Sequence, residues 1–329
     1  MKVTVLSKKD VQKAITMTEA IEAVKNAYIQ LSRGNTDVPQ RSHIPVKDKG
    51  VTLFMPAYLP AAESLGTKIV SVFPGNPGKD LPTVHAVVVA IDTETGQPEA
   101  VMDGTYLTAV RTGAASGVAT ELLARKEAKN VCIIGAGIQG RTQLEAVCCV
   151  RNIKKVFVYD VNSKASRDYI KEMKRKGAPL PKDFENVASL KEVLRKSDII
   201  CTATTSLTPV FDDSDLKPGT HINGVGSYRL DMQEIPEETV ARSKVFVDSH
   251  KASMAETGDL IIPLKKGVIT EEHIQTEIGQ VAAGEAQGRS SKEEITFFKS
   301  VGVAVQDVAV SKLIVEKVLK QGIGKETEL

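Results

Sequence analysis

The stretch Val131-Cys132-Ile133-Ile134-Gly135-Ala136-Gly137-Ile138-Gln139-Gly140 decides the fold of this 329-residue chain. Its apolar start predicts a buried strand over 130–134, and the residues after the glycines have helical spacing. Gly135 permits a tight turn, Gly137 lets backbone amides approach a pyrophosphate, and Gly140 allows the helix to pack closely on the strand. This is the pattern of a dinucleotide-binding loop.

An acidic residue follows at the distance that such a loop requires. Asp160 ends the next predicted strand, Lys155–Tyr159, twenty positions after Gly140. A carboxylate there accepts hydrogen bonds from the adenine-ribose hydroxyls of NAD and repels the 2′-phosphate of NADP. Since no arginine follows Asp160 directly, the sequence favours NAD(H) over NADP(H).

Strands and helices alternate through the middle of the chain, which implies a parallel sheet covered on both faces. Further strands are expected over 198–203, 220–225 and 244–247, and helices over 163–176 and 189–195. The loop Thr202-Ala203-Thr204 suits a position beside the nicotinamide ribose, although an ordinary polar turn would have the same composition.

The flanks have a different pattern and predict a second domain. Short β-rich runs broken by Pro and Gly indicate an antiparallel or mixed sheet, and the remaining long segments have helical spacing. We expect an α/β protein with a Rossmann NAD-binding domain over 125–301, whose doubly wound sheet is complete well before the last helix. A discontinuous α/β substrate-binding domain is expected over 1–124 and about 302–329. The expected strands of the flanks are Val51–Met55, Thr67–Phe73, Thr83–Ile91 and Glu99–Asp103, and the expected helices are 15–31, 107–123, 270–283 and 302–321.

Composition argues against several other classes of protein. The 43 basic and 41 acidic residues leave a net charge of +2, which gives no electrostatic footprint for nucleic acid. The longest apolar run, Val84–Ile91, is too short to cross a bilayer, and the absence of a signal-like segment indicates the cytoplasm. The four cysteines and five histidines lack ligand spacing, so we expect reduced thiols and no metal site.

Three basic residues stand among apolar or small neighbours in the first part of the chain: Arg41, Lys68 and Arg111. An enzyme that uses a nicotinamide cofactor also needs residues that bind the substrate and that donate or accept a proton. Arginine binds carboxylates through paired hydrogen bonds, and lysine can shift its pKa and carry a proton. Each residue alone could be a surface or ion-pair residue, but together they predict a substrate that carries a carboxylate.

Several runs together resemble the ornithine cyclodeaminase/mu-crystallin family over nearly the whole chain. They are Arg111-Thr112-Gly113-Ala114-Ala115-Ser116, Ile133–Gly140, Leu53-Phe54-Met55-Pro56-Ala57, Gly66-Thr67-Lys68 and Met102-Asp103-Gly104. The resemblance implies a substrate-binding, dimerising α/β domain, a Rossmann domain, and a C-terminal helix that returns to the first domain. It also implies a homodimer, and hydride exchange between NAD(P) and an amino acid or cyclic imine.

The resemblance also assigns roles to individual residues. Arg41, Lys68, Arg111 and Met55 would bind the substrate, and Lys68 would also contact the water or nitrogen at the attacked carbon. Thr112 would touch the cofactor phosphates. The full set of expected cofactor-binding residues is Thr112, Gly135, Ala136, Gly137, Ile138, Gln139, Gly140, Asp160, Val161, Thr202, Ala203, Thr204, Val225, Gly226, Val301 and Gly302.

The segment 227–231 departs from the cyclodeaminase pattern. Tyr228 stands where cyclodeaminases carry an Asp that positions the distal amine of the substrate for ring closure. Asp231 comes three residues later, as in the ketimine-reductase-like branch of the family. The presence of His85 also resembles the pattern of that branch. The candidates for the catalytic acid or base are therefore Lys68, Asp231 and His85, although Asp231 could equally belong to the cap of the next helix.

The sequence thus predicts an NAD(H)-dependent oxidoreductase. It would interconvert an α-amino acid and its imine or keto acid, or reduce a ketimine such as pyrroline-2-carboxylate. Two alternatives stay open: an ornithine cyclodeaminase that recycles its NAD, and a non-catalytic small-ligand-binding protein of the mu-crystallin type. The expected partners are an amino-acid or imine substrate and a second copy of the chain, with no nucleic acid and no membrane.

Overall fold

The computed structural model describes residues 1–328, which form two compact units. The first contains residues 1–111 and the segment from Val303 onward, and the second contains Thr112–Gly302. Each unit is built on one sheet, of seven strands within the described residues. Among the helices of residues 1–328, none combines the length and apolar character needed to span a bilayer.

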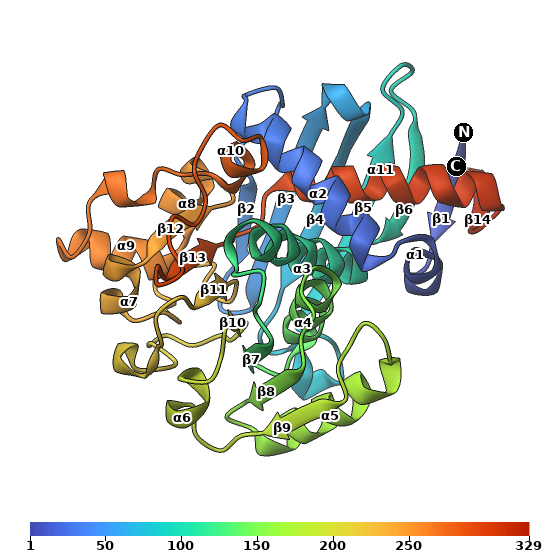
Figure 1. Cartoon of the computed structure of the whole chain (residues 1–329). Helices are drawn as coiled ribbons and strands as arrows, with labels where there is room; N and C mark the ends of the chain where they lie inside the picture. The colour runs from blue at the N-terminus through green and yellow to red at the C-terminus, as the bar shows by residue number, and fades with distance from the viewer. Residues whose placement is uncertain (329) are drawn as a thin grey trace. The chain divides into compact units, whose positions relative to one another are not determined.

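The sheet of the first unit is mixed, with the strand order β14-β1-β6-β5-β4-β3-β2 (Figure 1). Strands β1 and β6 pair in parallel and the other neighbours are antiparallel. The strands are β1 (Lys2–Leu6), β2 (Ser42–Val46), β3 (Gly50–Leu59), β4 (Ser64–Val72), β5 (Val84–Ile91), β6 (Pro98–Asp103) and β14 (Lys325–Glu328). The strands β1, β2 and β14 of this sheet were not predicted, although the run Val3-Thr4-Val5 in β1 is typical of a strand.

Two long helices cover one face of this sheet: α2 (Met17–Ser32) and α11 (Ala304–Gln321) (Figure 1). Helix α2 begins at a capping box, in which Thr16 and Glu19 satisfy each other's backbone amides. Side chains alternate along the strands, so the covered face is buried and the other face stays half-exposed. The first unit also contains α1 (Lys8–Ala14), the start of α3 (Gly104–Leu123) and the 3₁₀ turns Pro60–Ala62 and Asn76–Lys79.

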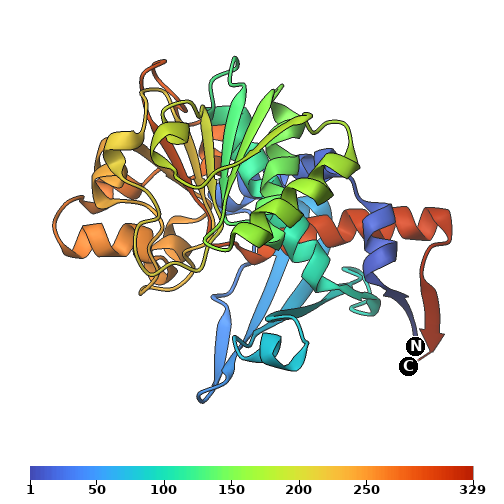
Figure 2. The same ribbon diagram turned by 90° about the horizontal axis from the view of Figure 1, so that it is seen from below.

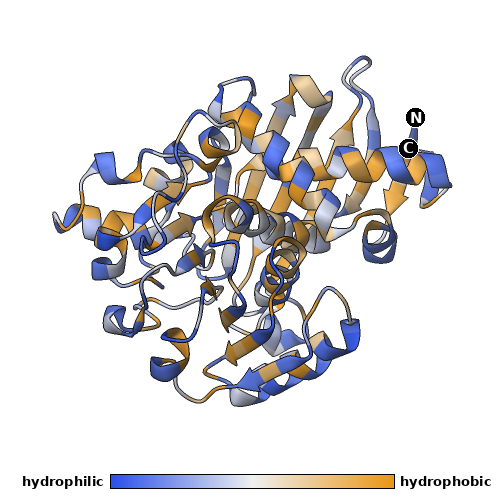
Figure 3. Cartoon of the chain, in the orientation of Figure 1, coloured by the Kyte–Doolittle hydropathy of each residue, from blue (hydrophilic) through white to orange (hydrophobic). Residues whose placement is uncertain are grey.

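The second unit is a Rossmann domain whose parallel sheet has the order β12-β13-β11-β10-β7-β8-β9. Helices lie on both faces of this sheet (Figure 2), and apolar residues concentrate in the strands (Figure 3). The strands are β7 (Asn130–Ile134), β8 (Lys155–Tyr159), β9 (Asp183–Asn186), β10 (Ile199–Thr202), β11 (His221–Gly224), β12 (Lys244–Val247) and β13 (Thr296–Lys299). The helices are α4 (Ile138–Val150), α5 (Ser163–Lys176), α6 (Lys191–Leu194), α7 (Glu237–Arg242), α8 (His250–Glu256), α9 (Gly258–Lys265) and α10 (Ile278–Ala282), with 3₁₀ turns at Asp213–Asp215 and Glu271–Ile274.

The two units divide inside α3, between Arg111 and Thr112. Within the second unit, Gly113 lets this helix pack against α4: a Cβ there would lie 2.5 Å from the Thr142 carbonyl oxygen. The structure corrects two expectations about the elements of this unit. Strand β13 completes the Rossmann sheet late in the chain, between β11 and β12. The helix expected over 270–283 is interrupted, because Glu277 forms an extended bridge with Val247.

Candidate active site

Two of the predicted substrate-binding residues meet around a buried carboxylate in the first unit. Asp307, in the first turn of α11, accepts hydrogen bonds from Lys68 Nζ at 2.7 Å and from Arg111 Nε at 3.0 Å. All three side chains are buried. The structure therefore brings together Lys68 from β4 and Arg111 from α3, with Asp307 between them as a counter-ion that the sequence analysis did not identify.

A second residue of α11 orients Arg111. Gln306 accepts a hydrogen bond from Arg111 Nη1 at 2.8 Å through Oε1, and its Nε2 donates to Tyr28 Oη at 2.5 Å. The guanidinium carries five N–H donors, so contacts through Nε and Nη1 fix its plane and still allow it to bind a carboxylate. Met55 lies opposite Lys68 in the register of β3 and β4 and is buried on the same face.

Burial and neighbouring charge lower the pKa of Lys68 to about 7. Loss of hydration is the largest cause, and the positive charge of Arg111 adds to it, while Asp307 opposes both. The charge of Arg41, in the segment before β2, lowers the pKa further, which places Arg41 close enough to act on this cluster. An ammonium with such a pKa can give or take a proton near neutrality.

The other two predicted catalytic residues have surroundings that do not favour proton transfer. His85 is exposed and faces Ser71 across β4 and β5, so the alternation of the strand puts it on the sheet face opposite to that of Lys68. Asp231 is exposed in the second unit and forms a two-point ion pair with Arg229, at 2.9 and 3.0 Å. That contact lowers the pKa of Asp231, so this carboxyl is not a proton donor at neutral pH.

The glycine loop of the second unit has the backbone that pyrophosphate binding requires. Gly135 adopts a φ of +104°, and a Cβ there would lie 2.5 Å from the Ala203 carbonyl oxygen. A Cβ on Gly140 would lie 2.2 Å from the Gly135 oxygen. At Gly137, by contrast, no described atom lies within 4 Å of a Cβ, and this residue begins α4 without a side-chain cap among the described residues. The open space and the uncapped amides fit a bound phosphate.

Asp160 stands at the end of β8 and is tied to the same loop. Its Oδ2 accepts a hydrogen bond from the Ala136 amide and its Oδ1 accepts one from the Asn162 amide, both at 2.8 Å. Each carboxylate oxygen can accept more than one hydrogen bond, so ribose hydroxyls can still bind. Val161, which follows, is 94% exposed and presents apolar surface next to this carboxylate.

The remaining predicted cofactor residues are held by partners that the sequence analysis missed. Glu234 binds the backbone or hydroxyl groups of Thr202, Thr204 and Gly226. Asp248 accepts hydrogen bonds from the Val301 and Gly302 amides at 2.9 and 2.7 Å. Gln143 donates to the Thr112 carbonyl, and the Val225 amide donates to the Thr202 carbonyl. A sequence signal existed for Glu234, which is an acidic residue directly before the apolar Ile235. Ile138 is exposed at the start of α4, and the Gln139 carbonyl accepts from Thr142.

Comparison with known proteins places the chain among relatives of similar length. The model of the ornithine cyclodeaminase/mu-crystallin family matches residues 1–322. A Δ1-pyrroline-2-carboxylate reductase of Bacillus cereus is 41% identical, with 98% of this chain and 99% of the relative covered. The solved Δ1-pyrroline-2-carboxylate reductase of Thermococcus litoralis, in complex with NADH and L-proline, is 47% identical with a TM-score of 0.95, covering 99% of this chain and 100% of that one. An archaeal alanine dehydrogenase dimer with bound NAD is 37% identical with a TM-score of 0.93, covering 100% of both chains. The predicted fold class is confirmed by these structures.

Proposed function

The chain belongs to the ornithine cyclodeaminase/mu-crystallin family, as its sequence predicted, and we propose that it is an NAD(H)-dependent reductase of Δ1-pyrroline-2-carboxylate or a closely related cyclic imino acid. The observation that carries the proposal is the buried cluster of Lys68, Asp307 and Arg111, which joins a carboxylate-binding group to a lysine of pKa about 7. The prediction of an NAD(H)-dependent oxidoreductase acting on amino acids or imines is confirmed by the relatives and their complexes.

The first unit supplies the groups that bind the substrate and move the proton. Arg111, with its plane fixed by Asp307 and Gln306, binds the substrate carboxylate together with Arg41. Lys68 gives a proton to the imine nitrogen, which becomes the amine of the product, and Asp307 stabilises the ammonium before the transfer. Met55 packs beside Lys68 on the apolar face of β3. His85 and Asp231 have no part in this scheme.

The second unit supplies the cofactor site. The pyrophosphate would lie over Gly137 and the first amides of α4, and Asp160 would accept the ribose hydroxyls, with the side chain of Val161 against the adenine. The cofactor site is completed by Thr112 and by the loops that contain Thr202–Thr204, Val225–Gly226 and Val301–Gly302. NADH bound there supplies the hydride that adds to the imine carbon.

Residues of the segment after β11 argue against cyclodeamination. The half-buried Tyr228 offers a phenol where ring closure requires an anionic partner for the distal ammonium of the substrate. Asp231, three residues later, is engaged by Arg229 in an ion pair and does not replace that anionic partner. Reduction of a substrate that is already cyclic needs no such partner. A purely ligand-binding role would not need a buried lysine whose pKa lies near neutrality.

We propose further that the protein is a homodimer assembled through the uncovered face of the first sheet. Apolar side chains follow one another across its strands and are only half-buried. An apolar face of this kind marks a protein–protein interface. The residues concerned are Phe54, Ile69, Val87, Val89 and Val101. The buried free thiols Cys132, Cys148 and Cys201 suit the reducing cytoplasm, which we propose as the compartment.

The test of the proposed function is a steady-state assay of the purified protein. Δ1-pyrroline-2-carboxylate with NADH should give L-proline and a matching loss of NADH absorbance, and NADPH should be a poorer donor. L-ornithine with catalytic NAD should release no ammonia. NADH consumption that fails with every cyclic imino acid and every α-imino acid, or stoichiometric ammonia and proline from ornithine, would refute the proposal.

A further inference from the structure

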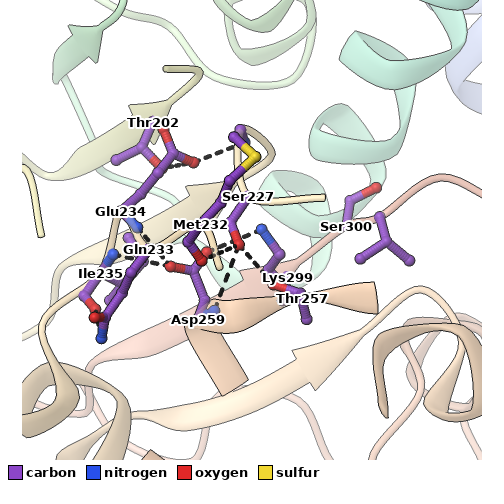
Figure 4. A network of polar contacts seen from close by, with 12 residues as sticks. Thr202, Ser227, Met232, Gln233, Glu234, Ile235, Thr257, Asp259, Lys299 and Ser300 are labelled. Carbon is purple, nitrogen blue, oxygen red and sulfur yellow. Dashed lines mark hydrogen bonds and ion pairs between the residues drawn. The ribbon is translucent and has the colours of Figure 1, made fainter. Parts of the chain in front are cut away.

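A buried carboxylate joins two loops at the carboxyl ends of the Rossmann strands. Glu234 Oε1 accepts hydrogen bonds from the Thr204 amide at 2.6 Å and the Thr204 hydroxyl at 2.8 Å. Its Oε2 accepts from the Thr202 hydroxyl at 2.9 Å and the Gly226 amide at 2.7 Å. Figure 4 shows Glu234 beside Thr202 in this network. Thr202 is the last residue of β10, Thr204 follows that strand and Gly226 follows β11, so one side chain connects the ends of two neighbouring strands.

The connected loops are packed without spare room. A Cβ on Gly226 would lie 2.2 Å from the Thr204 carbonyl oxygen and 2.5 Å from Glu234 Oε1. On the other side, a Cβ on Gly135 would lie 2.5 Å from the Ala203 oxygen. Since β11, β10 and β7 are adjacent in the sheet, a displacement of the Thr202–Thr204 loop is passed directly to the first glycine of the phosphate loop.

A second layer of buried charge holds the backbone of Glu234. Asp259 Oδ1 accepts hydrogen bonds from the Glu234 amide at 2.6 Å and the Ile235 amide at 3.1 Å. Lys299 Nζ donates to Asp259 Oδ2 at 2.9 Å, and both members of this ion pair are fully buried (Figure 4). The partners of the Glu234 carboxylate itself are neutral donors. Burying a carboxylate in this way is costly where apolar packing could close a turn, which points to a functional reason for it.

We propose that Glu234 is a positioning residue for the nicotinamide end of the cofactor, because its carboxylate sets the spacing between the Thr202–Thr204 loop and Gly226. This inference rests on the proposed NAD(H) site, to which these loops belong. Glu234 is not among the predicted cofactor-binding residues. The inference assigns it, together with the buried Asp259–Lys299 ion pair that holds its backbone, a role in positioning the cofactor. Glu234 acts through the loops rather than by touching the cofactor.

Replacing Glu234 by glutamine breaks the connection between the two loops, while the size and shape of the side chain change little. A threonine hydroxyl can rotate to accept a hydrogen bond, but the Thr204 and Gly226 amides can only donate. The glutamine side chain must direct its NH₂ group at one of these two amides, whichever way it is turned. Glu234→Gln therefore keeps one loop in place and releases the other.

Asp198 provides a control at the opposite end of the same sheet. Its Oδ2 accepts hydrogen bonds from two backbone amides, those of Lys129 and of Asn130 at the start of β7, at 2.9 and 3.0 Å. Its Oδ1 pairs with Arg125 and Lys217 at 2.8 and 2.7 Å. Asp198→Asn makes the same chemical change at the amino end of the strands. It should lower the melting temperature without altering the cofactor loops.

The experiment compares wild type, Glu234→Gln and Asp198→Asn by three measurements: amide hydrogen exchange of the cofactor-free protein, NADH binding by fluorescence titration, and the primary isotope effect with 4-deuterated NADH. We expect faster exchange at the Thr204 or Gly226 amide in Glu234→Gln, and a Kd for NADH raised roughly tenfold, which corresponds to one lost hydrogen bond. The isotope effect should grow as misplacement slows hydride transfer. Asp198→Asn should match wild type in all three measurements at these loops.

Equal NADH affinity and isotope effect in Glu234→Gln and Asp198→Asn, with wild-type turnover, would overturn the inference and leave the proposed function intact. A wild-type protein that binds no NADH would overturn both. If Glu234→Gln does not fold, Thr202→Val removes one donor to Oε2 and should raise the Kd for NADH by a few-fold; wild-type affinity in that variant would overturn the inference.

Discussion

Lys68 Nζ donates a hydrogen bond of 2.7 Å to Asp307 Oδ2, and neither side chain is more than 1% exposed. In most ion pairs the carboxylate would raise the pKa of the lysine. Here loss of hydration and the charge of Arg111 outweigh it, and the pKa falls to about 7. The pair therefore holds a transferable proton near neutrality.

Asp307→Asn should move the pH profile of imine reduction toward acid. The carboxylate raises the pKa of Lys68, so its loss lowers that pKa by about one unit or more. The limb of kcat/KM that falls with rising pH, which reports the free enzyme, should shift to lower pH by that amount. Asp168→Asn, at an exposed ion pair with Lys164, serves as the control and should leave the limb in place. An unmoved limb in Asp307→Asn would contradict the assignment.

Asp160→Ser should weaken discrimination between the two nicotinamide cofactors. Serine can still accept from the Ala136 amide but carries no charge to repel a 2′-phosphate. We expect KM for NADH to rise roughly tenfold and the preference for NADH over NADPH to narrow. Asp183→Ser, on the edge strand β9, should change neither value. An unchanged cofactor preference in Asp160→Ser would show that this carboxylate does not distinguish the ribose of NADH from that of NADPH.

The buried His221 should make the fold sensitive to acid. Loss of hydration lowers the pKa of His221 to about 3 in the folded chain, whereas the unfolded residue titrates near 6.5. The ring is thus neutral when folded, so its contribution to stability is complete above about pH 6.5 and is lost as the pH falls toward 3. The loss amounts to roughly 5 kcal/mol at most. Denaturant unfolding of His221→Gln should depend less on pH over this range; an equal pH dependence would argue against the assignment.

A charge on the uncovered face of the first sheet should dissociate the proposed dimer. Val89→Asp places a carboxylate between Thr67 and Val101 on that face, where an interface would have to bury it. Leu319→Asp changes an exposed apolar residue of α11 instead and is the control. Light scattering should give a monomer mass only for Val89→Asp. A dimer that survives this change would place the interface elsewhere.

The sequence predicted those features whose signal is local. The strand, glycine loop and helix over 130–150 follow one another, and Lys68 and Arg111 stand out as basic residues among apolar neighbours. Asp307 could not be predicted as their partner, because it lies 239 positions from Lys68 and only the fold brings them together. The position of His85 could not be predicted, because it depends on the register of β4 and β5, which puts it on the face opposite to that of Lys68. Strand β13 was not predicted, and its place between β11 and β12 becomes evident only from the pairing in the sheet.

Lys68 is the proposed proton donor for imine reduction, and the reaction rate of Lys68→Met tests this role. In a stopped-flow single turnover with NADH and Δ1-pyrroline-2-carboxylate, the wild-type rate should fall as the pH rises through about 7. Lys68→Met should be slower by about 10²–10⁴-fold, should lose this pH dependence, and should bind NADH with wild-type affinity. A Lys68→Met enzyme that reduces the imine at a rate close to that of wild type, with the same pH dependence, would show that Lys68 is not the proton donor.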